Sequence, residues 1–169
     1  MAFAAPLLVK ARQTGVEYGV DLHGDTLFVW TNDEHVNFRL ATAPLADPGT
    51  WTTLIAGSDH FYLTDFSLFA DFYVTEGRLD GLDQIQIRQY GDPGAVETIA
   101  FPEASYSAGL GSNPEWQVDR LRLGYESMVT PGTVYDYHLA TRALEVLKVQ
   151  EIPSGYDASL YTTERLQIP

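Results

Sequence analysis

The sequence of 169 residues contains no cysteine, which excludes disulfides, thiolate catalysis and cysteine-ligated metals. The absence of cysteine does not identify the redox compartment. We expect the protein to be located in the cytoplasm, with the periplasm as the alternative. No apolar run reaches the length of a membrane span. The apolar start turns polar at Lys10 and has no basic residue before it, so we interpret it as part of a strand rather than a signal peptide.

Basic residues are scarce, with 10 Lys and Arg against 23 Asp and Glu and a net charge of -13. Nucleic-acid binding needs a basic surface, so this balance argues against it and against binding to anionic membranes. A solvated acidic surface explains the charge in the simplest way. The sharper hypothesis is an acidic field that attracts cationic ligands.

Helical periodicity is almost absent. The best helical candidate, residues 140–149, fits a turn followed by a strand equally well. The remainder consists of segments of five to eight residues, rich in aromatic and branched side chains and separated by Gly, Pro, Asp and Asn. This pattern predicts an all-β protein.

The predicted strands repeat at intervals of 45 to 50 residues, and each repeat holds four of them. Such a period is typical of the four-stranded blades of a β-propeller. The predicted strands are 16–22, 26–31, 36–42 and 51–55, then 62–69, 71–76, 83–89 and 96–100, then 105–110, 120–125, 133–139 and 144–148.

The predicted loops carry turn residues at corresponding places. Asp47-Pro48-Gly49 and Asp92-Pro93-Gly94 precede the fourth strands of the first and second repeats. Ala140-Thr141-Arg142 precedes the fourth strand of the third repeat. Asp80-Gly81 and Thr130-Pro131-Gly132 precede third strands. Proline fixes φ and glycine permits positive φ, so these stretches are suited to hairpins.

Two of the predicted strands, residues 27–30 and 72–74, are apolar on both faces. A sheet with one solvated face would alternate, so this pattern favours sheets stacked between neighbours. A β-sandwich made from the same twelve strands is the main alternative. We predict three blades at about 13–56, 57–102 and 103–150, within a partial propeller spanning 1–152.

Three blades are fewer than the four to eight that usually close a propeller. Residues 7–11 fit the outer strand of a preceding blade, and residues 160–168 fit a strand that ends the sequence. We therefore expect the chain to be part of a larger protein, with residues 153–169 crossing toward another domain.

Residues with catalytic potential form no recognisable site. The histidines, of which the first three are expected to be exposed, show no metal-ligand spacing; they are His23, His35, His60 and His138. Ser107 and Ser112 lie near glycines, but neither fits the elbow that presents a nucleophilic serine before a helix.

Acidic residues are interpreted as solvated turn residues rather than carboxylate dyads or cation sites. The pairs in question are Asp33 with Glu34 and Asp80 with Asp83, and neither fits a calcium loop. Glu76 and Arg78 share one face of a strand and are expected to pair with each other or across strands. We predict no catalytic residue, no metal site and no cofactor, and the substrate-binding residues stay unassigned.

Two stretches of the last third carry a more specific signal. Residues 125–135 read YESMVTPGTVY, and residues 161–166 read YTTERL after the run 146–156. Together with 32–40 and 76–82, they resemble the propeller of oligopeptidase B, also called protease II, in the prolyl oligopeptidase class of serine peptidases. The family motif has serine where this chain has Thr163.

This resemblance implies the last blades of a seven-bladed propeller that caps an α/β-hydrolase domain and admits only short peptides. Oligopeptidase B cleaves after Arg and Lys, so the implied partners are short basic peptides and the hydrolase domain. The chain itself is expected to be inactive, since the family's catalytic triad has no counterpart in it.

Two other functions stay open. One is a stand-alone interaction module that associates with itself through exposed blade faces and edges. The other is a carbohydrate-binding β-sandwich using exposed rings of Trp30, Trp51 and Trp116, against which the wholly apolar context of Trp30 speaks.

Overall fold

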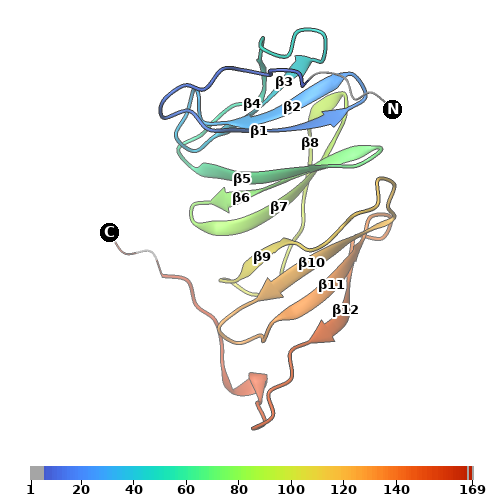
Figure 1. Cartoon of the computed structure of the whole chain (residues 1–169). Helices are drawn as coiled ribbons and strands as arrows, with labels where there is room; N and C mark the ends of the chain where they lie inside the picture. The colour runs from blue at the N-terminus through green and yellow to red at the C-terminus, as the bar shows by residue number, and fades with distance from the viewer. Residues whose placement is uncertain (1–5, 167, 169) are drawn as a thin grey trace. The chain divides into compact units, whose positions relative to one another are not determined.

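The computed structural model describes residues 6–166 and 168, which form three four-stranded antiparallel sheets (Figure 1). Within each sheet the strands are hydrogen-bonded in sequence order. The first holds β1 (Tyr18–His23), β2 (Thr26–Thr31), β3 (Arg39–Pro44) and β4 (Thr52–Ile55). The second holds β5 (Phe61–Leu68), β6 (Phe72–Leu79), β7 (Leu82–Gln89) and β8 (Asp92–Thr98). The third holds β9 (Ser107–Leu110), β10 (Arg120–Glu126), β11 (Thr133–His138) and β12 (Ala143–Val149).

The chain divides into two compact units, and the boundary falls inside β5, between Leu63 and Thr64. The first unit has a small core in which β2 and β3 bring Leu27 opposite Ala43 and Val29 opposite Ala41. The opposite face of β2 is also covered, since Phe28 is 4% exposed. The prediction that this strand is buried on both of its faces is therefore confirmed for β2.

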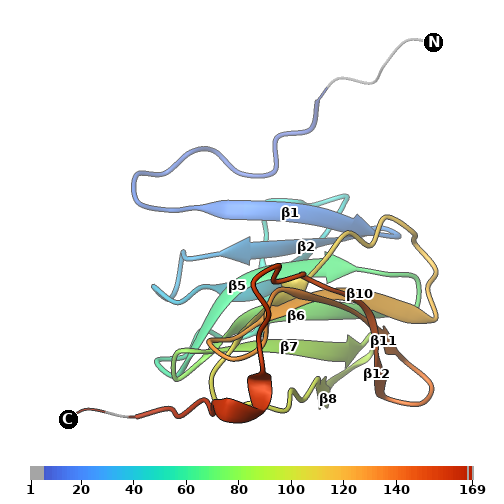
Figure 2. The same cartoon turned by 90° about the horizontal axis from the view of Figure 1, so that it is seen from below.

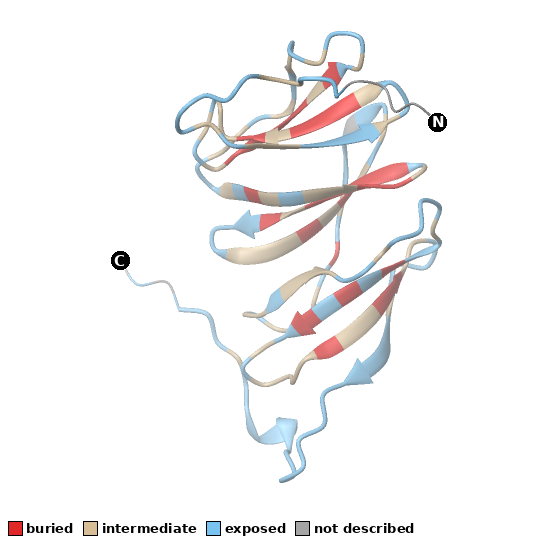
Figure 3. Cartoon of the chain, in the orientation of Figure 1, coloured by how far each residue is buried: buried red, intermediate tan, exposed pale blue. Residues whose placement is uncertain are grey.

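The second unit is built by the sheets β5–β8 and β9–β12 packing face to face. Their shared core consists of buried aliphatic and aromatic side chains from both sheets and from the residues that directly follow β5 and β8: Phe69, Phe72, Val74, Ile85, Ile87, Ile99, Leu121, Leu123 and Tyr137. Alternation is clear in β10, whose odd-numbered residues Leu121, Leu123 and Tyr125 are buried. Figure 3 shows the buried positions on the middle strands and an almost wholly exposed β12.

Over the residues that the structure describes after β12, the chain forms no strand and contains one short 3-10 turn, η1 (Ala158–Leu160) (Figure 2). The predicted strand at 160–168 is therefore wrong over 160–166, and residue 167 lies outside the described residues. Residues 160–166 are exposed except for Thr163, so no sheet neighbour supplies the hydrogen bonds that a strand needs. Among the residues that the structure describes, no helix is long and apolar enough to cross a membrane.

The predicted strand at residues 7–11 is also wrong. This stretch is held by side chains instead: the Tyr18 hydroxyl donates to the Lys10 carbonyl at 2.7 Å, and the Lys10 ammonium lies 3.8 Å from the centre of the Trp51 ring.

The third strand of the first sheet begins later than predicted, at Arg39 rather than at residue 36. Phe38 has a φ of 63°, which interrupts extended backbone, and Val36 is 77% exposed. The buried Phe38 ring stacks on Trp30 at 3.9 Å between ring centroids, so packing stabilises this unusual conformation.

The loop predicted at Asp92-Pro93-Gly94 belongs to β8 instead. The chain reverses at Tyr90-Gly91, where Gly91 has a φ of 83°, and a register irregularity follows between Arg88 and Gln89. β8 is an edge strand, which is one of the places in a sheet where proline is tolerated. The other four predicted turns lie between strands as expected.

Candidate functional site

The histidines lie on different elements: His23 ends β1, His138 ends β11, and His35 and His60 lie in loops. His60 is exposed as predicted, whereas His23 and His35 are half-buried. The Nδ1 of His35 accepts from the Asn37 backbone N–H at 3.1 Å, and the Nε2 of His138 lies 2.8 Å from Glu145. Among the described residues, no group of three or more His, Asp and Glu could hold a metal ion.

Asp33 and Glu34 serve as counter-ions for a buried arginine. Arg39 is 3% exposed and donates to both carboxylate oxygens of Asp33, at 2.7 and 2.9 Å, while Glu34 lies 3.2 Å away. The hydrogen bond from Arg39 lowers the pKa of Asp33 below its ordinary value, against the opposing effect of burial. This arrangement stabilises the first unit rather than binding a cation.

Asp83 and Glu76 fix the position of β9. The Asp83 carboxylate accepts from Arg78 at 2.9 Å and from the Ala108 backbone N–H at 3.1 Å, so Arg78 pairs across strands. Glu76 instead accepts from the Leu110 N–H at 2.7 Å. Burial raises the pKa of Glu76, and the neighbouring carboxylates of Asp65 and Asp83 add to this effect.

Neither of the two serines lies directly before a helix: Ser107 begins β9, and Ser112 follows it in the loop before β10. Trp30 and Trp51 are half-buried by Phe38 and by Tyr18 with Lys10, whereas Trp116 is 49% exposed. These contacts do not support a carbohydrate platform built on all three rings.

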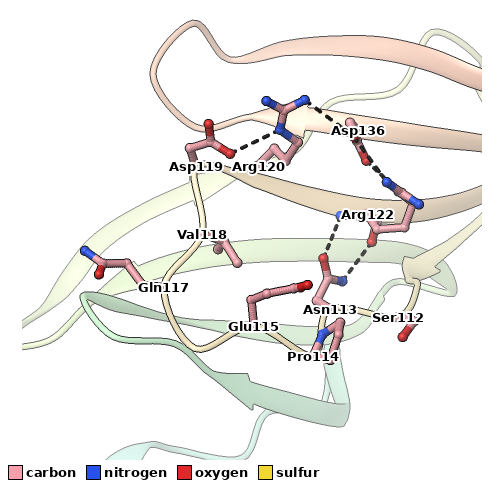
Figure 4. A pocket seen from close by; sticks show the side chains of 10 residues that line it. All are labelled: Ser112, Asn113, Pro114, Glu115, Gln117, Val118, Asp119, Arg120, Arg122 and Asp136. Carbon is pink, nitrogen blue, oxygen red and sulfur yellow. Dashed lines mark hydrogen bonds and ion pairs between the residues drawn. The ribbon is translucent and has the colours of Figure 1, made fainter.

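The second unit has a pocket of about 760 Å³ between the β9–β10 loop and the open face of β10 and β11 (Figure 4). Its lining residues are Ser112, Asn113, Pro114, Glu115, Gln117, Val118, Asp119, Arg120, Arg122 and Asp136. This pocket was not predicted from the sequence, although alternation in RLRLGY places Arg120 and Arg122 on one strand face.

Asp136 joins the two arginines that line this pocket, and its side chain is 4% exposed. Arg122 Nε donates to Asp136 Oδ1 at 2.5 Å, and Arg120 lies 3.8 Å from Oδ2 and also pairs with Asp119 (Figure 4). Asn113 fixes the loop, because its Oδ1 accepts from the Arg122 backbone N–H at 2.7 Å and its Nδ2 donates to the Arg122 carbonyl at 3.0 Å.

This pocket offers hydrogen bonds and charges of both signs, but no paired nucleophile and base. The arrangement is able to bind polar or charged groups.

Comparisons with known proteins agree with the fold. Residues 4–150 match the family described as prolyl oligopeptidase, N-terminal beta-propeller domain. Dipeptidyl aminopeptidase BI of Pseudoxanthomonas mexicana is 37% identical over 96% of this chain and 22% of its own length. Protease 2 of Moraxella lacunata is 29% identical over 94% of this chain and 23% of its own length.

Solved structures show the same architecture. Oligopeptidase B from Trypanosoma brucei superposes with a TM-score of 0.83 and 31% identity, over 89% of this chain and 23% of that one. Oligopeptidase B from Leishmania major gives 0.82 and 27%, over 94% and 24%. The chain thus spans less than a quarter of the length of these relatives, and it belongs to the N-terminal β-propeller family of the prolyl oligopeptidases.

Proposed function

We propose that this chain is the propeller part of an oligopeptidase B-like serine peptidase that cleaves short peptides after Arg or Lys. In this role it limits the size of entering substrates and favours basic peptides. An α/β-hydrolase domain, which is the proposed partner, performs the cleavage. The observation that carries the specificity proposal is the excess of carboxylates in a chain similar to oligopeptidase B.

The acidic excess is shared by both compact units. Up to Leu63 there are 7 acidic and 3 basic residues, a net charge of -4, and from Thr64 onward there are 16 and 7, a net charge of -9. Several of the basic side chains already have acidic partners: Lys10, Arg39, Arg78, Arg120, Arg122 and Arg142. A field of one sign attracts ligands of the opposite sign and speeds their encounter.

Peptide binding to the purified chain tests the charge proposal. Two labelled peptides of equal length, one rich in arginine and one rich in glutamate, are compared by fluorescence anisotropy at low and high salt. We expect preference for the arginine peptide at low salt and a smaller preference at high salt, because salt screens exposed charges beyond about 10 Å at 0.1 M. Equal binding of both peptides at low salt contradicts the proposed bias.

The pocket provides a matched pair of variants for this assay. Glu115→Gln and Asp119→Asn together remove two pocket carboxylates, whereas Asp21→Asn and Asp59→Asn together remove two exposed carboxylates from the first unit. If peptides enter the pocket, the pocket double variant weakens binding of the arginine peptide more than the control double variant does. Equal effects would indicate a diffuse field without a local site.

Catalysis is tested separately with an arginyl chromogenic substrate. The chain alone is expected to show no turnover. Turnover that a serine-directed reagent blocks would contradict the assignment of cleavage to another domain.

A second candidate activity for the whole enzyme is release of N-terminal dipeptides, because the relative from Pseudoxanthomonas mexicana is named a dipeptidyl aminopeptidase. Substrates with free and blocked N-termini distinguish the two. An oligopeptidase cleaves both, whereas a dipeptidyl aminopeptidase needs the free amine.

Self-association is favoured by a different observation. β12 is an edge strand, and its residues Val146, Leu147 and Val149 are 54%, 43% and 46% exposed. Exposed apolar edges are templates for pairing between chains. Sedimentation at increasing concentration tests this alternative, and Val146→Lys should abolish any growth in mass that β12 causes.

A further inference from the structure

Glu103 lies in the loop before β9, and its carboxylate accepts four hydrogen bonds from hydroxyl groups. Oε1 accepts from Tyr125 at 3.1 Å and Thr130 at 2.5 Å, and Oε2 accepts from Ser127 at 2.7 Å and Thr163 at 2.5 Å. We call these five residues the Glu103 cluster. They come from three separate parts of the second unit and include hydroxyls of both stretches that resemble the oligopeptidase B family.

The cluster also organises the β10–β11 loop. The Ser127 hydroxyl accepts from the backbone N–H groups of Val129 and Thr130, at 2.9 and 2.7 Å, while it donates to Glu103. Burial by itself would raise the pKa of Glu103, but the hydrogen bonds from Thr130, Thr163, Ser127 and Tyr125 lower it to about 2. The carboxylate is therefore charged at neutral pH and accepts from all four hydroxyls.

The segment after β12 has few other means of attachment. Residues 151–166 are exposed apart from Thr163, and Thr163 is the residue that Glu103 holds. Two further hydrogen bonds flank it: the Tyr156 hydroxyl donates to the Val129 carbonyl at 2.5 Å, and the Arg165 guanidinium donates to the Asp80 carbonyl. A segment with little apolar burial opens readily unless such polar contacts restrain it.

We propose that Glu103 is a positioning residue that fastens segment 151–166 to the second unit and sets the direction in which the chain leaves the sheets. Its importance for a peptidase rests on the proposed function, in which this segment leads toward the hydrolase domain. A hydroxyl at position 163 is sufficient for the attachment, so serine should replace Thr163 without loss.

Distance measurements between spin labels test this proposal directly. The chain has no cysteine, so Val146→Cys in β12 and Leu160→Cys in the segment, 54% and 73% exposed, give two unique labelling sites. With Glu103 and Thr163 intact we expect a narrow distance distribution. Glu103→Ala and Thr163→Val should each broaden it and speed amide exchange in 151–166 about fivefold to tenfold, as expected for loss of about 1 kcal/mol.

Thr163→Ser and Thr162→Val are the controls, and both should keep the narrow distribution, because the first retains the hydroxyl and the second changes an exposed neighbour. Thr163→Val changes only the segment, so it remains informative if Glu103→Ala fails to fold. Narrow distributions in both Glu103→Ala and Thr163→Val would overturn the proposal, as would broadening in Thr163→Ser. These measurements involve neither peptide binding nor cleavage. A result that overturns the role of Glu103 therefore leaves the proposed function untouched, and the reverse also holds.

Discussion

The hydroxyl of Tyr137 in β11 donates a 2.5 Å hydrogen bond to Oε1 of Glu97 in β8. The other oxygen of Glu97 lies 3.1 Å from the Arg142 guanidinium in the turn before β12. Tyr137 is 4% exposed and belongs to the core that the two sheets of the second unit share. A single carboxylate thereby connects one sheet to two elements of the next.

Removing this hydroxyl should weaken the second unit. We expect Tyr137→Phe to lower the free energy of unfolding by about 1 to 3 kcal/mol, because Glu97 loses a donor while the ring stays in place. Urea denaturation measures the change. Tyr135→Phe, two positions earlier in β11, is the control and should stay within about 0.5 kcal/mol. Equal effects of both variants would contradict a specific role for the Tyr137–Glu97 bond.

Alkaline pH should destabilise the protein through its tyrosines. Burial raises the pKa of Tyr125 and Tyr137 above the ordinary value of 10, and the carboxylates of Glu103 and Glu97, respectively, raise it further. The stability that these two phenols contribute is fully present below pH 10. It is lost as the pH rises above 10, because the tyrosines of the unfolded chain ionise at lower pH than those of the folded chain. We expect the urea midpoint to fall above pH 10, and less steeply in Tyr137→Phe. A midpoint independent of pH in this range would contradict the shifts.

The buried arginine of the first unit makes Asp33 more important than Glu34. Asp33→Ala leaves Arg39 without its bidentate partner, and we expect a loss of about 3 to 5 kcal/mol. Glu34→Ala removes a carboxylate that is 61% exposed and should cost about 1 kcal/mol or less. Thermal unfolding of both variants gives the comparison.

The same pair has a defined acid dependence. Because the pKa of Asp33 is lowered in the folded state, its contribution is present above its unfolded pKa and lost as the pH falls below it. The difference between the natural chain and Asp33→Ala should therefore shrink below about pH 4. A constant difference would contradict the ion-pair explanation.

Gly57 allows the backbone to pass close to His35. A Cβ at this position would lie 2.2 Å from the His35 Cβ and 3.0 Å from the Phe38 carbonyl oxygen. Gly57→Ala should thus destabilise the first unit by about 1 to 3 kcal/mol or more through overpacking. Gly124→Ala in β10, where a Cβ meets nothing within 4 Å, is the control in a urea titration. An unchanged free energy of unfolding in Gly57→Ala would indicate that the loop around His35 moves to accommodate the added methyl group.

The strand repeat and most hairpins could be predicted because they depend on local patterns. Alternation and turn residues predicted twelve strands, and the structure has all twelve, with β2 at the predicted bounds. Prediction was wrong where tertiary packing overrides local preference, as at Phe38, whose ring stacks on Trp30 while its φ is positive. The turn predicted to begin at Asp92 begins two residues earlier, because Gly91 supplies the positive φ that the reversal needs. An irregularity in the register between β7 and β8 accommodates this shift.

The candidate site was less accessible to prediction from sequence. Arg120 and Arg122 lie on one strand face by simple alternation, but their shared partner Asp136 depends on the register of β10 against β11. Glu76 and Arg78 were expected to pair within or across strands. Arg78 does pair across strands, whereas the carboxylate of Glu76 accepts a hydrogen bond from the backbone N–H of Leu110.

The sequence by itself determined the acidic charge, the all-β repeat and the family resemblance, since each depends on composition or on residues close together along the chain. Only the tertiary structure decided which carboxylate meets which donor. Glu103 and Thr163 are 60 residues apart, and no local pattern specifies their contact. Such pairs form because folding brings distant segments together, and a carboxylate that loses part of its water must find hydrogen-bond donors wherever the backbone places them.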